Sequence, residues 1–150
     1  SKYITARTNS QAVDVIEKLF PNKTIIPFEL LKSNDDARNS ALHLDCCLQP
    51  VGNNKAITCP DGFLDKNQYQ WIVDLFGADN IFEISREEMY NMHCNIFSID
   101  KNVVVSDRAF TRLNTWLEEN NFIVEKIKYT EVSKQGGLLR CSTLPLIREN

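Results

Sequence analysis

The sequence contains no long hydrophobic run, and it is poor in glycine and proline. Its 150 residues include only five of each, and no apolar stretch reaches the roughly 18 residues that a membrane helix needs. We also expect no signal peptide. We therefore expect residues 1–150 to form one block without a linker, in the cytoplasm and without a membrane partner.

A basic surface stripe is also lacking. The formal net charge is -3, and the 17 lysines and arginines are scattered along the sequence. Binding to nucleic acid is therefore not expected. With 43% hydrophobic and 25% charged residues, the composition is that of a folded globular domain.

The cysteines form no paired pattern. There are five of them, an odd number without any C-x-x-C pair, which argues against a disulfide framework or a structural zinc site. We expect reduced thiols, no bound metal and no cofactor. Considered singly, most such thiols are small buried hydrophobic side chains. The cysteines are Cys46, Cys47, Cys59, Cys94 and Cys141.

Apolar spacing predicts three amphipathic helices, and a capping box formed by Ser85 and Glu88 predicts a short helical turn. The signals at the ends of the three longer helices are the Thr8 and Gln11 capping box, Pro21, Gly77 and Asp107. Short β-prone runs lie between the helices. They are Tyr3–Ala6, Thr24–Phe28, Leu42–Leu48, Lys55–Cys59, Asn80–Ile84, Asn95–Ile99, Asn102–Ser106, Phe122–Lys128 and Leu138–Leu144.

The order of these elements repeats. Residues 42–84 and 95–128 each predict strand, hairpin turn, strand, helix and strand, which indicates stacked α/β modules. Residues 2–28 carry only the later part of such a unit. We therefore expect about two and a half modules, completed by an N-terminal segment or a second chain, with a homo-oligomer also possible.

Cys141 follows two glycines and two leucines in the sequence Gly136-Gly137-Leu138-Leu139-Arg140-Cys141. Glycines let the backbone pass close to a ligand. Arg140 beside the thiol favours the thiolate, which is the nucleophilic form. The alternative is a β-turn that leads into a core strand with a buried cysteine.

His43 and Asp45 lie in the predicted strand Leu42–Leu48. Alternation places His43, Asp45 and Cys47 on one face of that strand, so a proton carrier would stand beside a fixed negative charge. A half-buried structural histidine is the alternative. His93 occupies the corresponding place in the next repeat and is interpreted as structural. Arg7 precedes the first helix and could hold a carboxylate bidentately, or simply be solvated.

Three stretches together resemble the guanidino-group-modifying enzymes, which include arginine deiminases, amidinotransferases and dimethylarginine dimethylaminohydrolases. The stretches are Leu42-His43-Leu44-Asp45, the Gly136 to Thr143 segment, and Arg7-Thr8-Asn9. The resemblance implies a five-bladed α/β propeller, the pentein fold of ββαβ modules. Residues 1–150 would then be the C-terminal portion of one catalytic domain.

The resemblance also implies roles for individual residues. Cys141 matches the nucleophile, His43 the general acid/base, and Arg7 an arginine that holds the substrate carboxylate. Asp45 stands where the dimethylarginine branch usually has lysine, and it is similar to the aspartate that grips the guanidinium in deiminases and amidinotransferases. A carboxylate bonded to both guanidinium nitrogens favours an unsubstituted guanidine.

The expected activity is therefore hydrolysis of a small guanidino substrate such as arginine. Amidinotransfer and dimethylarginine hydrolysis are alternatives. The family also uses a further acid beside a Gly-Gly pair, which would precede Lys2. The sequence lacks this acid, so an inactive fragment or a binding module that keeps the fold without the chemistry stays open.

Overall fold

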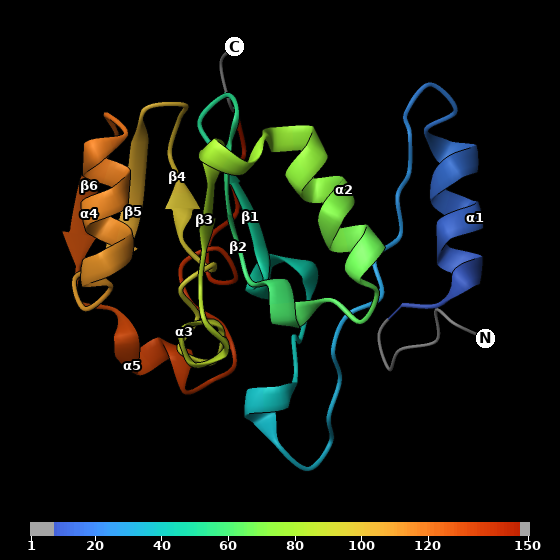
Figure 1. The fold of residues 1–150 in the computed structure, drawn as a ribbon, viewed down its shortest axis with the longest axis horizontal. Helices are drawn as coiled ribbons and strands as arrows, with labels where there is room; N and C mark the ends of the chain where they lie inside the picture. Colours follow the sequence, from blue (N-terminus) through green and yellow to red (C-terminus); the bar gives the residue numbers. More distant parts are fainter. Residues whose placement is uncertain (1–7, 148–150) are drawn as a thin grey trace.

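Two three-stranded sheets form the centre of the molecule (Figure 1). The computed structural model describes residues 8–147. The first sheet contains β1 (Leu48–Val51), β2 (Lys55–Thr58) and β3 (Ile81–Glu83). The second contains β4 (Phe97–Ser98), β5 (Val103–Asp107) and β6 (Ile123–Ile127).

Both sheets have the same topology, which confirms the predicted repeat. In each, an antiparallel hairpin is followed by a helix and by a third strand that pairs parallel to the second. The connecting helices are α2 (Lys66–Phe76) and α4 (Thr111–Glu119). A mixed α/β fold made of ββαβ modules, as expected for part of a propeller, is therefore observed.

The two modules share one hydrophobic core. Ile57 and Ile72 of the first module, and Val104 and Leu117 of the second, are fully buried. The turn of the first hairpin also packs on the second module. Gly52 has a φ of +60°, and a Cβ atom there would lie 2.9 Å from the ring of Phe122. Only glycine meets both the backbone and the packing requirement at this turn.

The helices largely follow the prediction. α3 (Arg86–Tyr90) begins with the predicted capping box, in which Ser85 and Glu88 bond reciprocally. α1 (Ser10–Leu19) is also present, at the edge of the molecule away from the two sheets (Figure 1). Its predicted cap is wrong, because the side chain of Asn9, not of Thr8, accepts the Ala12 N–H at 3.1 Å.

Three predicted strands are wrong, and a fourth, Tyr3–Ala6, lies outside the described residues. Thr24–Phe28 is irregular; the nearby Leu30 forms only an isolated bridge with Phe63. The run Leu42–Leu48 contains a 3-10 helix at Leu44–Cys46, and its strand begins only at Leu48.

The third failure, Leu138–Leu144, is a series of turns. Hydroxyl groups satisfy its carbonyls: Ser142 Oγ donates to Leu138 O at 2.6 Å, and Thr143 Oγ1 donates to Leu139 O at 2.8 Å. Local bonds of this kind compete with the bonds of a sheet.

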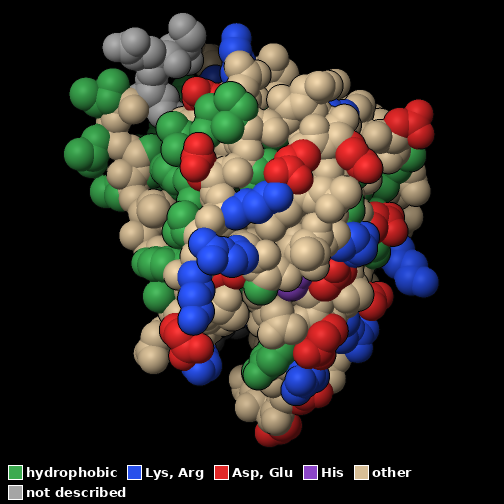
Figure 2. Space-filling model, turned by 90° about the vertical axis from the view of Figure 1, so that its left-hand side faces the viewer, with side chains coloured by type: hydrophobic (Ala, Val, Ile, Leu, Met, Phe, Trp, Pro, Cys, Tyr) green, Lys and Arg blue, Asp and Glu red, His purple; other side chains and the backbone are tan. Residues whose placement is uncertain are grey.

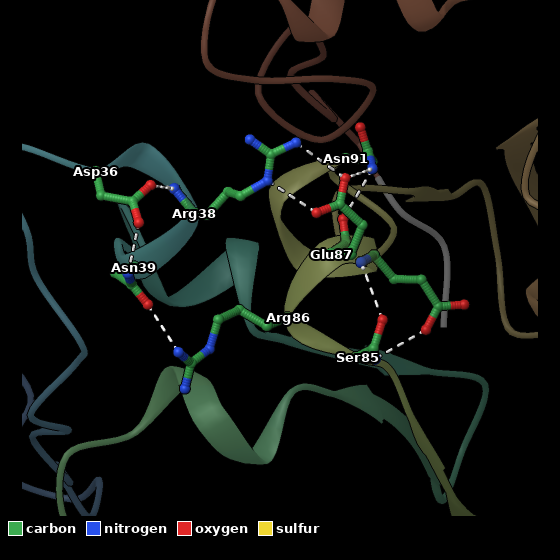
Figure 3. A network of polar contacts seen from close by, with 8 residues as sticks. Asp36, Arg38, Asn39, Ser85, Arg86, Glu87 and Asn91 are labelled. Carbon is green, nitrogen blue, oxygen red and sulfur yellow. Dashed lines mark hydrogen bonds and ion pairs between the residues drawn. The ribbon is translucent and has the colours of Figure 1, made fainter.

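A polar network ties the segment before His43 to α3 (Figure 3). Arg38 Nε lies 2.9 Å from Glu87 Oε2, and Arg86 Nη1 donates to Asn39 Oδ1 at 2.7 Å. Arg38 and Asn39 belong to the 3-10 segment Ala37–Asn39. This network fixes the segment that leads to the predicted general acid/base.

Every helix among residues 8–147 is too short or too polar to span a bilayer. The surface facing the viewer in Figure 2 carries charges of both signs, interspersed, while hydrophobic side chains gather along one edge of that view. On β6, an edge strand of the second sheet, Ile123 and Ile127 are exposed.

Candidate active site

The thiol of Cys141 lies beside the carboxylate of Asp45. Cys141 is exposed, and its Sγ is 3.6 Å from Asp45 Oδ2. The two residues are 96 positions apart in the chain. The alternative of a cysteine buried in a core strand is therefore wrong. A thiol, which could act as a nucleophile, and a carboxylate, which could bind a cation, therefore lie together at an accessible position.

Asp45 reaches this position from the 3-10 helix Leu44–Cys46, for which His43 is the N-cap residue. In this helix His43 is exposed, Asp45 is half-buried and Cys47 is fully buried. The predicted alternation, with all three on one face, is therefore wrong. The helical turn directs Asp45 toward Cys141 and sends Cys47 into the core.

An open pocket of about 570 Å³ lies next to this pair. Asp45 and Arg140 both line it, so carboxylate and guanidinium charges face the same space. His43 lines a neighbouring pocket of about 350 Å³, and Leu44 contributes to both. The lining of the first pocket is Leu44, Asp45, Leu48, Gln49, Pro50, Ser98, Arg140 and Pro145.

Lys32 holds the chain that enters this 3-10 helix. Its Nζ donates to the carbonyl oxygens of Ala41 and Leu42, the latter at 2.6 Å. The Ala41 N–H in turn donates to Leu31 O at 2.8 Å. The backbone next to His43 is therefore fixed from two directions, which limits where the imidazole can go.

Asn95 is a residue of the site that the sequence reading missed. It is fully buried, and its Nδ2 donates to Cys141 Sγ at 3.1 Å. Its Oδ1 accepts the N–H groups of Leu138 and Cys141, at 2.8 and 3.1 Å. It lies where a strand was predicted, and a polar residue between Cys94 and Ile96 was the one signal that could have marked it.

The glycines before Cys141 are required by close packing. A Cβ on Gly137 would lie 2.7 Å from Cys141 Cβ and 3.1 Å from its Sγ. Gly136 has a φ of +83°, a conformation that L side chains rarely adopt. The Gly-Gly pair therefore lets the chain turn tightly against the thiol.

The other four cysteines are buried. Burial raises the pKa of Cys46 and of Cys59 to about 11, and it also raises the pKa values of Cys47 and Cys94. Thiolates are the reactive form, so these four side chains are held in the inert state. Cys46 nevertheless lies near the site, with its Sγ 3.8 Å from Asp45 Oδ1.

His93 has a packing environment, as expected for a structural residue. Its ring stacks on Phe110 with centroids 3.8 Å apart, and Nδ1 lies 2.9 Å from Glu88 O. Burial lowers its pKa. Arg7, the predicted carboxylate-binding residue, lies outside the described residues. Among residues 8–147, no three or more His, Cys, Asp and Glu side chains are grouped as metal ligands.

Comparison with known proteins places these observations in a family. The family described as "N,N dimethylarginine dimethylhydrolase, eukaryotic" matches residues 3–148. The uncharacterized protein YkgA of Bacillus subtilis (strain 168) is 26% identical over 151 residues, which cover 97% of this chain and 47% of YkgA. The chain thus spans about half the length of this relative.

Solved structures share the fold. The N-terminal domain of ArgZ, an arginine dihydrolase of the ornithine-ammonia cycle in Cyanobacteria, was solved bound to product. It aligns with a TM-score of 0.75 and 21% identity over 90% of this chain and 46% of that chain. The same domain has been solved covalently bound to a reaction intermediate.

SxtG, an amidinotransferase of the saxitoxin biosynthetic pathway in Microseira wollei, aligns with a TM-score of 0.71. The identity is 18% over 95% of this chain and 40% of that one. Because the family match covers nearly the whole sequence, the chain belongs to the eukaryotic-type N,N-dimethylarginine dimethylhydrolase family, within the guanidino-group-modifying pentein enzymes.

Proposed function

We propose that the protein hydrolyses the guanidino group of arginine or a related small molecule, with Cys141 as nucleophile. The observation that carries this proposal is the 3.6 Å approach of Asp45 Oδ2 to Cys141 Sγ beside a pocket. A guanidinium bonded to Asp45 would present its central carbon to the sulfur. Charge-assisted bonds of this kind are strong and directional.

The proposed reaction has two steps. The Cys141 thiolate attacks the guanidinium carbon and forms a C–S bond, and the C–N bond to the departing amine breaks as His43 gives that nitrogen a proton. Water then attacks the thiouronium carbon while His43 takes one of its protons, and a second proton is released to the departed amine or to solvent. The C–S bond breaks, the thiolate is regenerated, and a ureido product leaves.

The negative charge of Asp45 favours an unsubstituted guanidine as the substrate. A carboxylate that accepts bonds from both terminal nitrogens leaves little room for N-methyl groups. Dimethylarginine is the second candidate, because the family match is to dimethylarginine hydrolases. Transfer of the amidino group to an amine in place of water is a third outcome of the same chemistry, and SxtG is an amidinotransferase.

The proposed reaction needs further groups besides Cys141, His43 and Asp45. Arg7 would hold the substrate carboxylate, Arg140 would contribute positive charge at the pocket, and a further acid would grip the guanidinium. We propose that residues 1–150 form the C-terminal portion of one catalytic domain. A binding module with the same fold and no chemistry is the alternative of another class.

The test is turnover by the complete protein and by its Cys141→Ala variant. Product formation should be measured with arginine, with asymmetric dimethylarginine, and with arginine plus an acceptor amine. We expect ureido product from arginine and none from the variant. Cys59→Ala, which removes a buried thiol from the core, is the matched control and should keep activity. Turnover that survives in Cys141→Ala would contradict the proposal.

A further inference from the structure

Asn95 contacts the Cys141 segment through its side chain and its main chain. Besides the three side-chain bonds, Asn95 O accepts the N–H groups of Leu139 and Arg140, at 3.0 and 3.2 Å. One buried residue thus binds four consecutive backbone N–H groups, those of residues 138–141. These bonds fix the segment to the start of the second module.

We infer that Asn95 is the positioning residue of the nucleophile: its Oδ1 sets the turn that carries Cys141, and its Nδ2 hydrogen bond holds the sulfur facing Asp45. This inference rests on the proposed function of Cys141. It adds a buried residue that contacts the thiol directly.

The oxygen and the nitrogen of the Asn95 side-chain amide have different hydrogen-bonding roles. An amide oxygen has two acceptor positions, and Oδ1 uses them for the N–H groups of Leu138 and Cys141. The NH2 group then necessarily points the other way, toward Sγ at 3.1 Å. A donor stabilises an anionic sulfur more than a neutral thiol. This donor would stabilise the thiolate that the proposed reaction requires.

Asn95→Asp tests the two roles separately, because it keeps the acceptor of the backbone N–H groups and removes the donor to the sulfur. The carboxylate keeps an oxygen for the two backbone N–H groups, but it places a second oxygen where Nδ2 donates to the sulfur. The control is Asn114→Asp. Asn114 is also buried, and its Nδ2 donates to Asp107 O at 2.9 Å, so the same substitution removes a buried amide donor away from Cys141.

The measurement is the rate of Cys141 alkylation by iodoacetamide in the complete protein, followed by mass spectrometry from pH 6 to 10. We expect Asn95→Asp to slow alkylation at pH 7.5 by about ten- to hundredfold and to move the rate profile to higher pH. Asn114→Asp should stay within about twofold of the parent. Equal rates in Asn95→Asp and the parent, or equal slowing in both variants, would overturn the inference.

A second measurement needs no variant, in case Asn95→Asp does not fold. In the unaltered protein, the NMR signals of the Asn95 side-chain NH2 should shift when Cys141 is alkylated, because the acceptor becomes a thioether. Unchanged signals would overturn the inference. Failure of the proposed function is a separate result, seen when unaltered Cys141 reacts with iodoacetamide but shows neither turnover nor selective labelling by chloroacetamidine.

Discussion

Asp45 Oδ2 lies 3.6 Å from Cys141 Sγ, so one carboxylate faces both the thiol and the pocket. The two functions of this carboxylate oppose each other. Under the proposed function, it would attract a guanidinium and repel the thiolate that attacks that guanidinium. A guanidinium that enters between the two groups would resolve this conflict.

Asp45→Asn should therefore change two rates in opposite directions. Alkylation of Cys141 by neutral iodoacetamide should become faster, since the like charge is removed. Labelling by cationic chloroacetamidine should become slower by about ten- to hundredfold, since a charge-assisted bond is lost. Parallel rate measurements at one pH check this, and two rates that move together would contradict it.

Gly137→Ala should impair the thiol while largely preserving the fold. The added Cβ would meet Cys141 Cβ at 2.7 Å, so Cys141 or the turn must move. A misplacement of about 1 Å costs about 10²-fold when reacting groups need precise placement. The measurement is chloroacetamidine labelling of Cys141 together with thermal unfolding.

Gly136→Ala is the control for that experiment. The Cβ at this position would meet only Leu42 Cδ2, at an ordinary 3.9 Å, although the φ of +83° remains unfavourable. Stability should fall by about 1 kcal/mol. Cys141 labelling should change much less than in Gly137→Ala, and an equal loss would assign the effect to backbone strain.

Gly52→Ala should destabilise the contact between the two modules. Gly52 has a φ of +60°, so alanine introduces backbone strain there; Gly77, with φ +81° and ψ +135°, has a backbone conformation that alanine tolerates less well. Only at Gly52 does the Cβ also meet Phe122, at 2.9 Å; at Gly77 the closest atom is Asn80 Nδ2, at 3.6 Å. Chemical denaturation should show Gly52→Ala to be less stable than the parent by about 1–3 kcal/mol, whereas any loss of stability in Gly77→Ala would come from backbone strain alone.

Glu88 should make stability depend on acid pH. Burial opposes its ionisation, but bonds from Arg112 and from the Ser85 N–H outweigh burial and lower the carboxyl pKa to about 2. A lowered folded-state pKa stabilises the fold above the unfolded-state value, and this contribution is lost as pH falls from about 4.5 toward 2.

Glu88→Gln should accordingly be less stable than the parent at pH 7, by about 1–2 kcal/mol. The difference should shrink at pH 3, as measured by urea unfolding at both values. Glu119→Gln, an exposed change on α4, is the control and should have little effect at either pH. A difference that is the same at pH 7 and pH 3 would contradict the assignment.

The repeat was predictable from the sequence because each module carries its own local signals. The two hairpin turns, the glycine after α2 and the Ser85 capping box are all encoded within a few residues, and the structure forms each of them. The spacing of the hydrophobic residues then predicted the helices. These features depend little on distant parts of the chain.

The site was only partly predictable. Motif resemblance selected Cys141 and Asp45, which the structure brings together. The predicted alternation failed at residues 42–48, because Leu44–Cys46 form a 3-10 helix. Lys32 holds the Leu42 carbonyl that precedes this helix. Asn95 was missed because its partners lie more than forty positions away, and only tertiary structure brings them near.

The burial of four of the five thiols has a practical consequence for oxidants. Peroxide reacts with accessible thiolates, and only Cys141 offers an exposed sulfur. If Cys141 is the nucleophile, as proposed, mild oxidation should inactivate the protein as this one thiol is consumed, and a reductant should restore it. Among the five cysteines, sensitivity to oxidants is therefore concentrated at one exposed side chain.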